Sequence, residues 1–309
     1  MNKNKIIIDT DPGVDDAIAI FLALASPEIE VLGLTTVAGN VPLETSFDNA
    51  RRICALANRK DIPIFKGFKK PLKRDFVDAA WVHGNDGIGG VTMPESDADF
   101  KKEHAVDFLL RTIRMNDDKT ITLATLGPLT NIAAALTQDL ETMKRLKKIV
   151  IMGGSFDKNA DPRGNSSLYA EYNIFADPHA ADIVFKCGID MVIVPMETGK
   201  QAVADRDFIN KVEQIDNPCA QAFCKMIENF MKRLDVDLAP LYDPCVSGYL
   251  LRPDIFEGVK GSIETVIDAD DEKFGLTDIY PDGSSNCLVA NKIDKDQFLA
   301  LVLERMARL

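Results

Sequence analysis

The sequence alternates short, β-branched apolar runs with longer amphipathic stretches along most of its length. We predict strands at the apolar runs, which lie at residues 5–9, 30–39, 62–65, 120–127, 147–154 and 190–196. We predict helices at the amphipathic stretches, which lie at residues 14–25, 44–58, 103–115, 129–136, 178–187, 205–215, 219–233, 244–251 and 294–308. Mostly apolar strands that alternate with helices are typical of a parallel sheet covered by helices on both faces.

The predicted fold is therefore α/β, with an open, mostly parallel sheet flanked by helices. The 309 residues suffice for one large domain or two smaller ones. Because we find no linker and no internal repeat, we expect a single domain over residues 1–309. No apolar run is long enough to span a bilayer, and the first residues lack the apolar core of a signal peptide, so we expect a cytoplasmic protein without a membrane partner.

Charge and cysteine content exclude two further classes. The net charge is −12, and the one dense basic run, at residues 66–74, is best explained as a solvated loop, which argues against nucleic-acid binding. The six cysteines are scattered and lie mostly in apolar surroundings, which favours reduced core residues over a disulfide framework or a zinc site.

Small, polar or acidic segments follow several of the predicted strands. They are DTDPGVDD (9–16), AGN (38–40), LGPLTN (126–131), MGG (152–154) and PMETG (195–199). In open α/β sheets, ligands bind beyond the carboxyl ends of the strands. We therefore expect a site built from these segments at the C-terminal strand ends.

The first of these segments is strongly acidic. Asp9, Asp11, Asp15 and Asp16 lie within eight positions, between two aliphatic runs. A helix dipole favours acids in the first turn, which accounts for Asp15 and Asp16 but not for the other two. Clustered oxygen ligands suit Ca²⁺ or Mg²⁺, and the lack of nearby histidine or cysteine argues against zinc. A hard divalent cation is the favoured interpretation, with a purely structural acid cluster as the alternative.

One acidic loop cannot supply the roughly six to eight oxygens that Ca²⁺ takes. Further oxygens would come from water, from substrate or from distant loops. Candidates in the chain are the backbone carbonyls before Gly127–Pro128 and the carboxylate of Asp243 in LYDPC. Asp243 equally suits the N-cap of a helix that opens with proline, so both interpretations stay open.

Taken together, these motifs resemble those of the nucleoside hydrolases, the inosine–uridine preferring ribohydrolase family. The shared segments are DTDPGVDDAIAI, AGN, TLGPLTNIA, IMGG, AEYNIFADPHAA and YDPC, in the order of the family, from residue 5 to about residue 250. The resemblance implies an open α/β fold, a tightly held Ca²⁺ ion and a homodimer or homotetramer. It also implies hydrolysis of the N-glycosidic bond of ribonucleosides, which gives free base and ribose.

The resemblance assigns roles to individual residues. The implied calcium ligands are Asp11, Asp16, the main-chain carbonyl of Leu126 and Asp243, and Asp11 is also the implied base for the calcium-bound water. The implied substrate contacts come from Asp15, Asn40, Met152, Asn165, Glu171, Asn173 and Asp243. His83 falls in a glycine-rich loop that is expected to be mobile over the site.

The sequence departs from the family pattern at Tyr242. Many members carry a histidine immediately before the last calcium-binding aspartate, where it can protonate the departing base. A phenol ordinarily titrates near pH 10, so it is a poorer donor at neutral pH than imidazole. Tyr242 and His83 are therefore the candidates for the acid, and the preference for purine or pyrimidine stays open. Asn229, Phe230 or Arg233 could contact the base, although the apolar spacing of their helix equally indicates packing.

Two other functions remain as alternatives. A phosphohydrolase with D-x-D after its first strand matches only Asp9 and Asp11 and would leave the predicted ribose ligands without a role. A calcium-stabilised protein that binds a nucleoside or sugar with little turnover is the second alternative, and Tyr242 is the residue that favours it.

Overall fold

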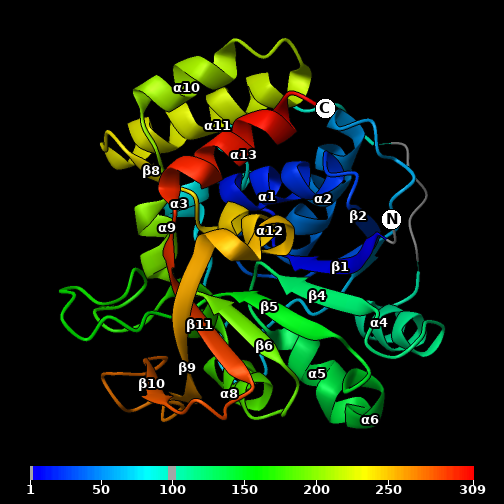
Figure 1. The fold of residues 1–309 in the computed structure, drawn as a ribbon, viewed down its shortest axis with the longest axis vertical. Coiled ribbons are helices and arrows are strands. Elements are labelled where there is room, and N and C mark those ends of the chain that lie inside the picture. Colours follow the sequence, from blue (N-terminus) through cyan, green and yellow to red (C-terminus); the bar gives the residue numbers. More distant parts are fainter. Residues whose placement is uncertain (1–2, 97–101) are drawn as a thin grey trace.

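A nine-stranded sheet runs through the computed structural model, which describes residues 3–96 and 102–309. The strand order is β10-β9-β11-β6-β5-β4-β1-β2-β3 (Figure 1). These strands are β1 (Asn4–Thr10), β2 (Ile29–Thr36), β3 (Ile64–Lys66), β4 (Ile121–Thr125), β5 (Lys148–Met152), β6 (Met191–Val194), β9 (Phe256–Thr265), β10 (Thr277–Pro281) and β11 (Cys287–Ile293). A separate antiparallel pair consists of β7 (Val203–Ala204) and β8 (Ala239–Pro240).

Most of the sheet is parallel, as predicted. The seven strands from β11 to β3 in this order pair in parallel, whereas β9 runs antiparallel to both β11 and β10. The six predicted strands are all present, with ends that differ by a few residues. Strands β9, β10 and β11 were not predicted, nor was the short pair β7 and β8.

Helices cover both faces of the sheet. They are α1 (Val14–Leu24), α2 (Leu43–Leu56), α3 (Ala80–His83), α4 (Ala105–Arg114), α5 (Thr130–Gln138), α6 (Leu140–Met143), α7 (Tyr172–Ala176), α8 (Pro178–Phe185), α9 (Met196–Gln201), α10 (Arg206–Glu213), α11 (Pro218–Leu234), α12 (Tyr242–Leu251) and α13 (Lys295–Met306), with a 3₁₀ turn at Pro253–Ile255. One face carries α1, α2 and α12, and the other carries α4, α5, α6 and α8 (Figure 1). The nine predicted helices are all among these thirteen α-helices of the described residues.

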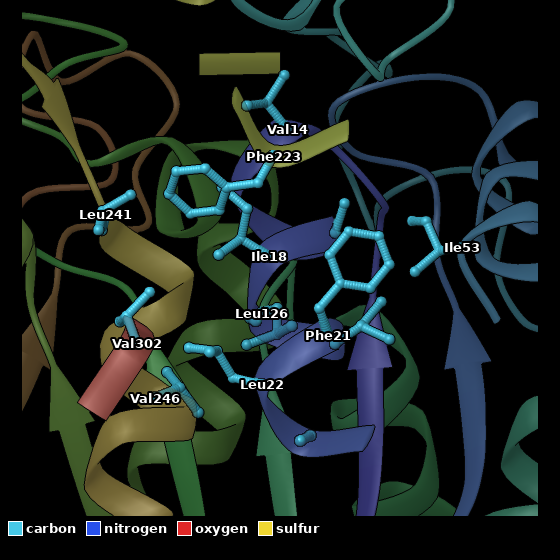
Figure 2. Close-up of a cluster of buried hydrophobic side chains, with 14 of the residues drawn as sticks. Val14, Ile18, Phe21, Leu22, Ile53, Leu126, Phe223, Leu241, Val246 and Val302 are labelled. Carbon is cyan, nitrogen blue, oxygen red and sulfur yellow. The ribbon is translucent and has the colours of Figure 1, made fainter. Parts of the chain in front are cut away.

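The strand residues alternate between two cores. In β1, Ile6 and Ile8 pack with α1 and its neighbours, while Ile7 packs with α4 and α5 on the opposite face. Helix α1 is buried almost all round, which explains why its sequence is apolar on every side. Figure 2 shows Ile18, Phe21 and Leu22 of α1 facing side chains that come from α2, α11, α12 and α13.

The topology places the site. From β1 the chain continues to β2 and β3 on one side, and β4, β5 and β6 then add on the other side of β1. Such a reversal of strand order leaves a crevice at the carboxyl ends of the two central strands. Here those strands are β1 and β4, and the backbone N–H of Leu126 donates to the carbonyl of Asp9 at 2.8 Å. Within the described part of the chain, every helix is too short or too polar to cross a bilayer.

Candidate active site

Asp11 lies where three strand-end loops meet. It follows β1, and both Asp11 and its neighbour Thr10 are fully buried. Oδ2 of Asp11 accepts a hydrogen bond from the backbone N–H of Asn40 at 2.6 Å. Oδ1 has no hydrogen-bond partner among the described residues, although it is buried. A buried carboxylate oxygen without a partner is costly, so this atom indicates a group that the protein is built to receive.

Two glycines make room for the Asp11 carboxylate. A Cβ atom at Gly39, after β2, would lie 2.0 Å from Oδ2, and one at Gly127, after β4, would lie 2.3 Å from Oδ1. Both distances are far below contact distance, so any side chain at either position would displace the carboxylate. These glycines therefore belong to the site, and their positions explain the AGN and LGP segments of the sequence.

Asp16 is held by the loop that precedes its helix. Its Oδ1 accepts from the Thr10 hydroxyl at 2.5 Å, and its Oδ2 accepts from the backbone N–H of Gly13 at 2.8 Å. The amide of Asn40 also donates to Oδ2, at 3.1 Å. These donors fix the orientation of the carboxylate at the start of α1, where the helix dipole favours negative charge.

Three carboxylates gather within the reach of one cation. One oxygen each from Asp15, Asp16 and Asp243 lies within 4.8 Å of the other two. Asp243 is 3% exposed and lies in the first turn of α12, whose N-cap is Leu241. The alternative that Asp243 merely caps its helix is therefore wrong, because the cap position belongs to another residue and the carboxylate points into the cluster.

Burial and mutual repulsion of the clustered carboxylates favour a bound positive charge. Burial raises the pKa of Asp11 and of Asp243 well above the usual range, and the neighbouring carboxylates raise both further. Burial, followed by the charge of Asp16, raises the pKa of Asp15 to about 7. Within the described ranges, no lysine or arginine forms an ion pair with these carboxylates. The basic group recorded near Asp15 is the imidazole of His83, whose Nδ1 lies 3.9 Å from Oδ1 of Asp15. Buried acids of this kind need a cation if they are to stay ionised.

The donor set suits a hard divalent cation. All the candidate ligands are oxygens. Asp11, whose Oδ1 has no partner among the described residues, is not one of the three clustered acids, but it lies close enough for the charges of Asp16 and Asp15 to raise its pKa. The carbonyl of Leu126, which was predicted as a ligand, lines the same pocket and accepts from the Asn173 amide at 2.6 Å. A carbonyl oxygen has two lone pairs, so it can accept this bond and still bind a cation. The residues present therefore fit a metal such as Ca²⁺.

Asp9 has a different environment from the other acids. Its Oδ2 accepts from the Thr35 hydroxyl at 2.5 Å and from the Asn131 amide at 2.8 Å, and its side chain is fully buried. Burial raises the pKa of Asp9 to about 7, although these two hydrogen bonds oppose the rise. Asp9 is not one of the three clustered acids, and its bonds tie β1 to β2 and α5 beneath the site.

The predicted ribose ligands stand on the other side of the crevice. Glu171 caps α7 and accepts from the backbone N–H groups of Asn173 at 2.9 Å, Ile174 at 3.2 Å and Gly154 at 3.0 Å. Its burial raises its pKa to about 7. The Asn173 amide also contacts Sδ of Met152, at 3.2 Å. Helix α7 thus carries two polar groups to the end of β5, next to the end of β4.

One pocket brings the predicted site residues together. Its lining includes Asp15, Asn40, His83, Leu126, Met152, Asn165, Glu171, Asn173, Tyr242 and Asp243. Asp11 and Asp16 are not among the lining residues, since they lie beneath it. The acid cluster therefore forms one end of a pocket whose walls carry amides and carboxylates from five separate segments.

His83 differs from its expected setting. It is the last residue of the short helix α3 rather than part of a loop, and it is 8% exposed. Its Nδ1 accepts the backbone N–H of Val14 at 3.1 Å, which fixes the tautomer with the proton on Nε2 when the ring is neutral. Burial lowers the pKa of His83 to about 4. At neutral pH the ring is then a neutral hydrogen-bond donor rather than an imidazolium.

Much of the remaining pocket lining is apolar. Phe230, which the sequence left open between contact with the base and packing, is part of this lining. The lining residues that the sequence did not predict are Val14, Ala79, Trp81, Val82, Ser166, Tyr172, Ile227, Leu234, Ala239 and Pro240. No motif marks them, because segments far apart in the sequence meet only in the folded chain. Asn229 instead donates to the carbonyl of Gly89 at 2.7 Å.

Tyr242 lines the pocket and directly precedes Asp243 in the chain. A Cβ at Gly199 of α9 would lie 2.1 Å from Cδ1 of Tyr242, so the ring fits against α9 only because residue 199 is glycine. Burial raises the pKa of Tyr242 further above its ordinary value, and the charge of Asp15 adds to the rise. The phenol is thus an even poorer acid here than in water, and its ring forms a fixed wall.

Comparison with known proteins gives one consistent match. The sequence profile of the family described as "Inosine-uridine preferring nucleoside hydrolase" matches residues 6–300. The pyrimidine-specific ribonucleoside hydrolase RihA of Photobacterium profundum is 38% identical over 317 residues, which cover 99% of each chain.

Solved structures agree with the sequence matches. A plant nucleoside hydrolase, the PpNRh1 enzyme, superposes with a TM-score of 0.89 at 33% identity and covers 98% of this chain and 99% of its own. The purine-preferring ribonucleoside hydrolase of Gardnerella vaginalis superposes with a TM-score of 0.91 at 28% identity and covers 98% of each chain.

Proposed function

Because the chain belongs to the inosine-uridine preferring nucleoside hydrolase family, we propose that it hydrolyses the N-glycosidic bond of ribonucleosides with the help of a bound Ca²⁺ ion. The products are the free base and ribose. The observation that carries this proposal is the pocket itself, in which a buried acid cluster faces polar groups suited to a sugar and an apolar wall suited to a base.

The proposed ligands of the cation are Asp11, Asp16, Asp243 and the carbonyl of Leu126, as the family resemblance implies. Asp15 belongs to the same cluster and lines the pocket, so it can hydrogen-bond a ribose hydroxyl close to the cation. When bound, Ca²⁺ supplies a positive charge that acidifies water and attracts hydroxyl oxygens.

The carboxylates have two tasks in the reaction. Asp11 takes the proton of the attacking water, which is general base catalysis by a group whose Oδ1 has no other partner among the described residues. Breaking the C1′–N bond leaves positive charge on the sugar, in an oxocarbenium-like transition state. Buried carboxylates at this end of the pocket stabilise that charge because they act at close range and away from bulk water.

The polar wall gives specificity for ribose. Asp15 and Asn40 would meet ribose hydroxyls, while Asn165, Glu171 and Asn173 would meet the 5′ and 3′ sides of the sugar. A sugar that lacks a hydroxyl leaves one of these groups unpaired, so deoxyribose is rejected. The base meets mostly apolar side chains, which distinguish bases less sharply than a hydrogen-bonding site would.

Protonation of the leaving base falls to Tyr242, to His83 or to solvent. The raised pKa of Tyr242 and the lowered pKa of His83 make both poor acids at neutral pH. Each can still donate a hydrogen bond to a base nitrogen or oxygen. This feature also favours the second candidate, a calcium-stabilised nucleoside-binding protein with weak turnover.

A nucleoside panel tests the proposal. The protein, with added Ca²⁺, is incubated with inosine, uridine, cytidine or adenosine, and free ribose is measured. A phosphomonoester, assayed for released phosphate, serves as the control for the phosphohydrolase alternative. Ribose from at least one nucleoside supports the proposal. Tight nucleoside binding without ribose would favour the binding protein, and phosphate release alone would favour the phosphohydrolase. The homodimeric or homotetrameric assembly and the cytoplasmic location stay predictions.

A further inference from the structure

The segment from Ser155 to Ala170 connects β5 to α7 and carries Asn165 and Ser166 to the pocket. The middle of the segment lies on the surface, with exposed side chains at residues 157–159 and 161–162. Asn165 is itself exposed although it lines the pocket. Buried apolar side chains hold the two ends of the segment, at Phe156 and Ala170, so another interaction must hold the residues between them.

Arg163 is the one charged residue of this segment that is buried, with 9% exposure. Its Nη2 donates to Oδ1 of Asp278 in β10 at 2.9 Å and also to the carbonyl of Thr277. Its Nε donates to the carbonyl of Ser155 at 3.0 Å. The guanidinium thus joins the start of the segment to the strand at the far edge of the sheet.

Further hydrogen bonds join Ser155 to Arg163 and close the segment into a loop. The Ser155 hydroxyl donates to the carbonyl of Arg163 at 2.7 Å and lies 2.8 Å from Oε1 of Glu197. The backbone N–H of Ser155 donates to the Thr277 hydroxyl at 3.1 Å. Ser155 and Arg163 are therefore bound to each other and, together, to β10.

The backbone carries this constraint from Arg163 to Asn165. The N–H of Arg163 donates to the carbonyl of Leu168 at 2.9 Å, and the N–H of Asn165 donates to the carbonyl of Ala170 at 3.2 Å. Between them, Gly164 packs directly on Ala170, since a Cβ there would lie 2.3 Å from the Ala170 carbonyl oxygen. A shift of Arg163 would therefore move Asn165, and Glu171 follows one residue after Ala170.

We propose that Arg163 is a positioning residue, which holds Asn165 and Ser166 at the 5′ end of the bound ribose through its ion pair with Asp278. This inference rests on the proposed function, because it needs a ribose in the pocket. A planar guanidinium suits the task, since its fork can bind two carbonyls and a carboxylate at once. The antiparallel edge of the sheet thereby takes part in sugar recognition without touching the sugar.

The test uses a substrate that lacks the contact. Inosine and uridine are compared with their 5′-deoxy analogues, and kcat and KM are measured for wild type, Arg163→Met and Asp278→Asn. We expect wild type to prefer the 5′-hydroxyl substrate by at least roughly tenfold, the worth of one hydrogen bond to a polar group. In Arg163→Met this preference should fall about tenfold, mainly through KM. Asp278→Asn should also lower the preference for the 5′-hydroxyl substrate, but by a smaller factor.

A matched control separates positioning from stability. Arg305 is also buried, at 6% exposure, and pairs with Glu28 at 2.9 Å, but it lies outside the pocket lining. Arg305→Met should therefore leave the preference for the 5′-hydroxyl unchanged. If Arg163→Met does not fold, Asp278→Asn decides the question.

Two negative outcomes are distinguishable. An active wild type that keeps its 5′-hydroxyl preference in Arg163→Met and in Asp278→Asn would overturn this inference alone. The inference would also be overturned if the variants lost the same factor in kcat/KM on the 5′-hydroxyl substrate and on its 5′-deoxy analogue. A wild type that releases no ribose from any nucleoside would overturn the proposed function as well.

Discussion

At the scale of single residues, the carboxylate of Asp11 occupies a closely fitted space. It is buried between two glycines, one oxygen is bound by the backbone of Asn40, and the other has no partner among the described residues. The sequence motif predicted that acids would gather at this strand end. It did not predict the glycine contacts, because these arise between loops that are far apart in the chain.

Asp11→Asn should abolish most of the activity. Asparagine fits the same space but cannot accept a proton at neutral pH, so kcat for ribose release should fall by a factor of about 10² to 10⁴. The circular dichroism spectrum and melting temperature should show that the variant is folded. Activity within threefold of wild type would exclude Asp11 as the base.

Gly127→Ala tests the space around the carboxylate. The added methyl group would overlap Oδ1 of Asp11, so we expect kcat/KM to fall at least about tenfold while the protein still folds. Gly283→Ala is the matched control, because a Cβ at that glycine meets nothing within 4 Å. Equal activities of the two variants would contradict the geometry described for Asp11.

Tyr242→Phe asks whether the phenol donates a proton. Since the pKa of Tyr242 is raised by burial, loss of the hydroxyl should change kcat by less than about threefold on any substrate. Tyr242→His should raise the rate on inosine, because imidazole is a stronger acid near neutral pH. A loss of about 100-fold in Tyr242→Phe would show instead that the phenolic proton is needed.

At the scale of elements, Asn131 of α5 ties together the ends of β1 and β2 and the segment that follows β3. Its amide donates to Oδ2 of Asp9 at 2.8 Å and to the carbonyl of Thr36 at 3.1 Å, and its Oδ1 accepts from the N–H of Phe68 at 2.9 Å. Asp9 therefore supports the site from below. The sequence analysis placed Asn131 in a strand-end segment but gave it no role.

Asn131→Ala should weaken this junction. It leaves Asp9 and the N–H of Phe68 short of partners in a buried place, so the free energy of unfolding should fall by about 2 kcal/mol or more. Urea denaturation measures the change, and Asn210→Ala on the exposed surface of α10 is the control. A loss no larger than that of the control would show that the junction contributes nothing to stability.

The six strands that the sequence predicted share a strong apolar pattern, and the missed strand β9 does not. The first six strands are short buried runs, as parallel sheets require. Strand β9, in contrast, contains two glycines and alternating charge, and most of its residues are exposed. Its pairing with β11 and β10 depends on contacts across the sheet, which local pattern does not reveal.

The same division holds for the site. Motif residues such as Asp15, Glu171 and Asp243 could be singled out in the sequence because oxygen-rich segments at strand ends are unusual, and the structure brings them to one pocket. Trp81, Ile227 and Leu234 could not, because apolar residues on helices are ordinary packing residues until the fold shows what they face. The roles assigned to all these residues stay predictions.

At the scale of the whole molecule, burial couples metal binding to pH and stability. The pKa values of Asp15 and Glu171 are raised to about 7, so the folded protein binds protons there more tightly than the unfolded chain. This stabilisation is complete below about pH 4 and is lost as the pH rises through about 7. In the metal-free protein, Asp15 and Glu171 should therefore contribute less to the free energy of unfolding at pH 7.5 than at pH 5.

Bound Ca²⁺ should stabilise the folded protein more at pH 7.5 than at pH 5. Protons compete with the cation for the cluster, so the rise in melting temperature on adding Ca²⁺ should be larger at pH 7.5 than at pH 5. Differential scanning fluorimetry of the metal-free protein, with and without Ca²⁺, measures both values. Asp243→Asn, which removes one charge from the cluster, should reduce the calcium effect. A shift that is larger at pH 5, or no shift at all, would contradict the electrostatics proposed for the cluster.

Hydrolysis of nucleosides by this chain should depend on a cation bound in the acid cluster. The most direct test is the rate of ribose release before chelation, after complete chelation, and after Ca²⁺ is restored to the same sample. We expect chelation to reduce the rate at least about 100-fold and Ca²⁺ to restore it, while a matched amount of Zn²⁺ does not. Ribose release that continues unchanged in the metal-free protein would contradict this dependence.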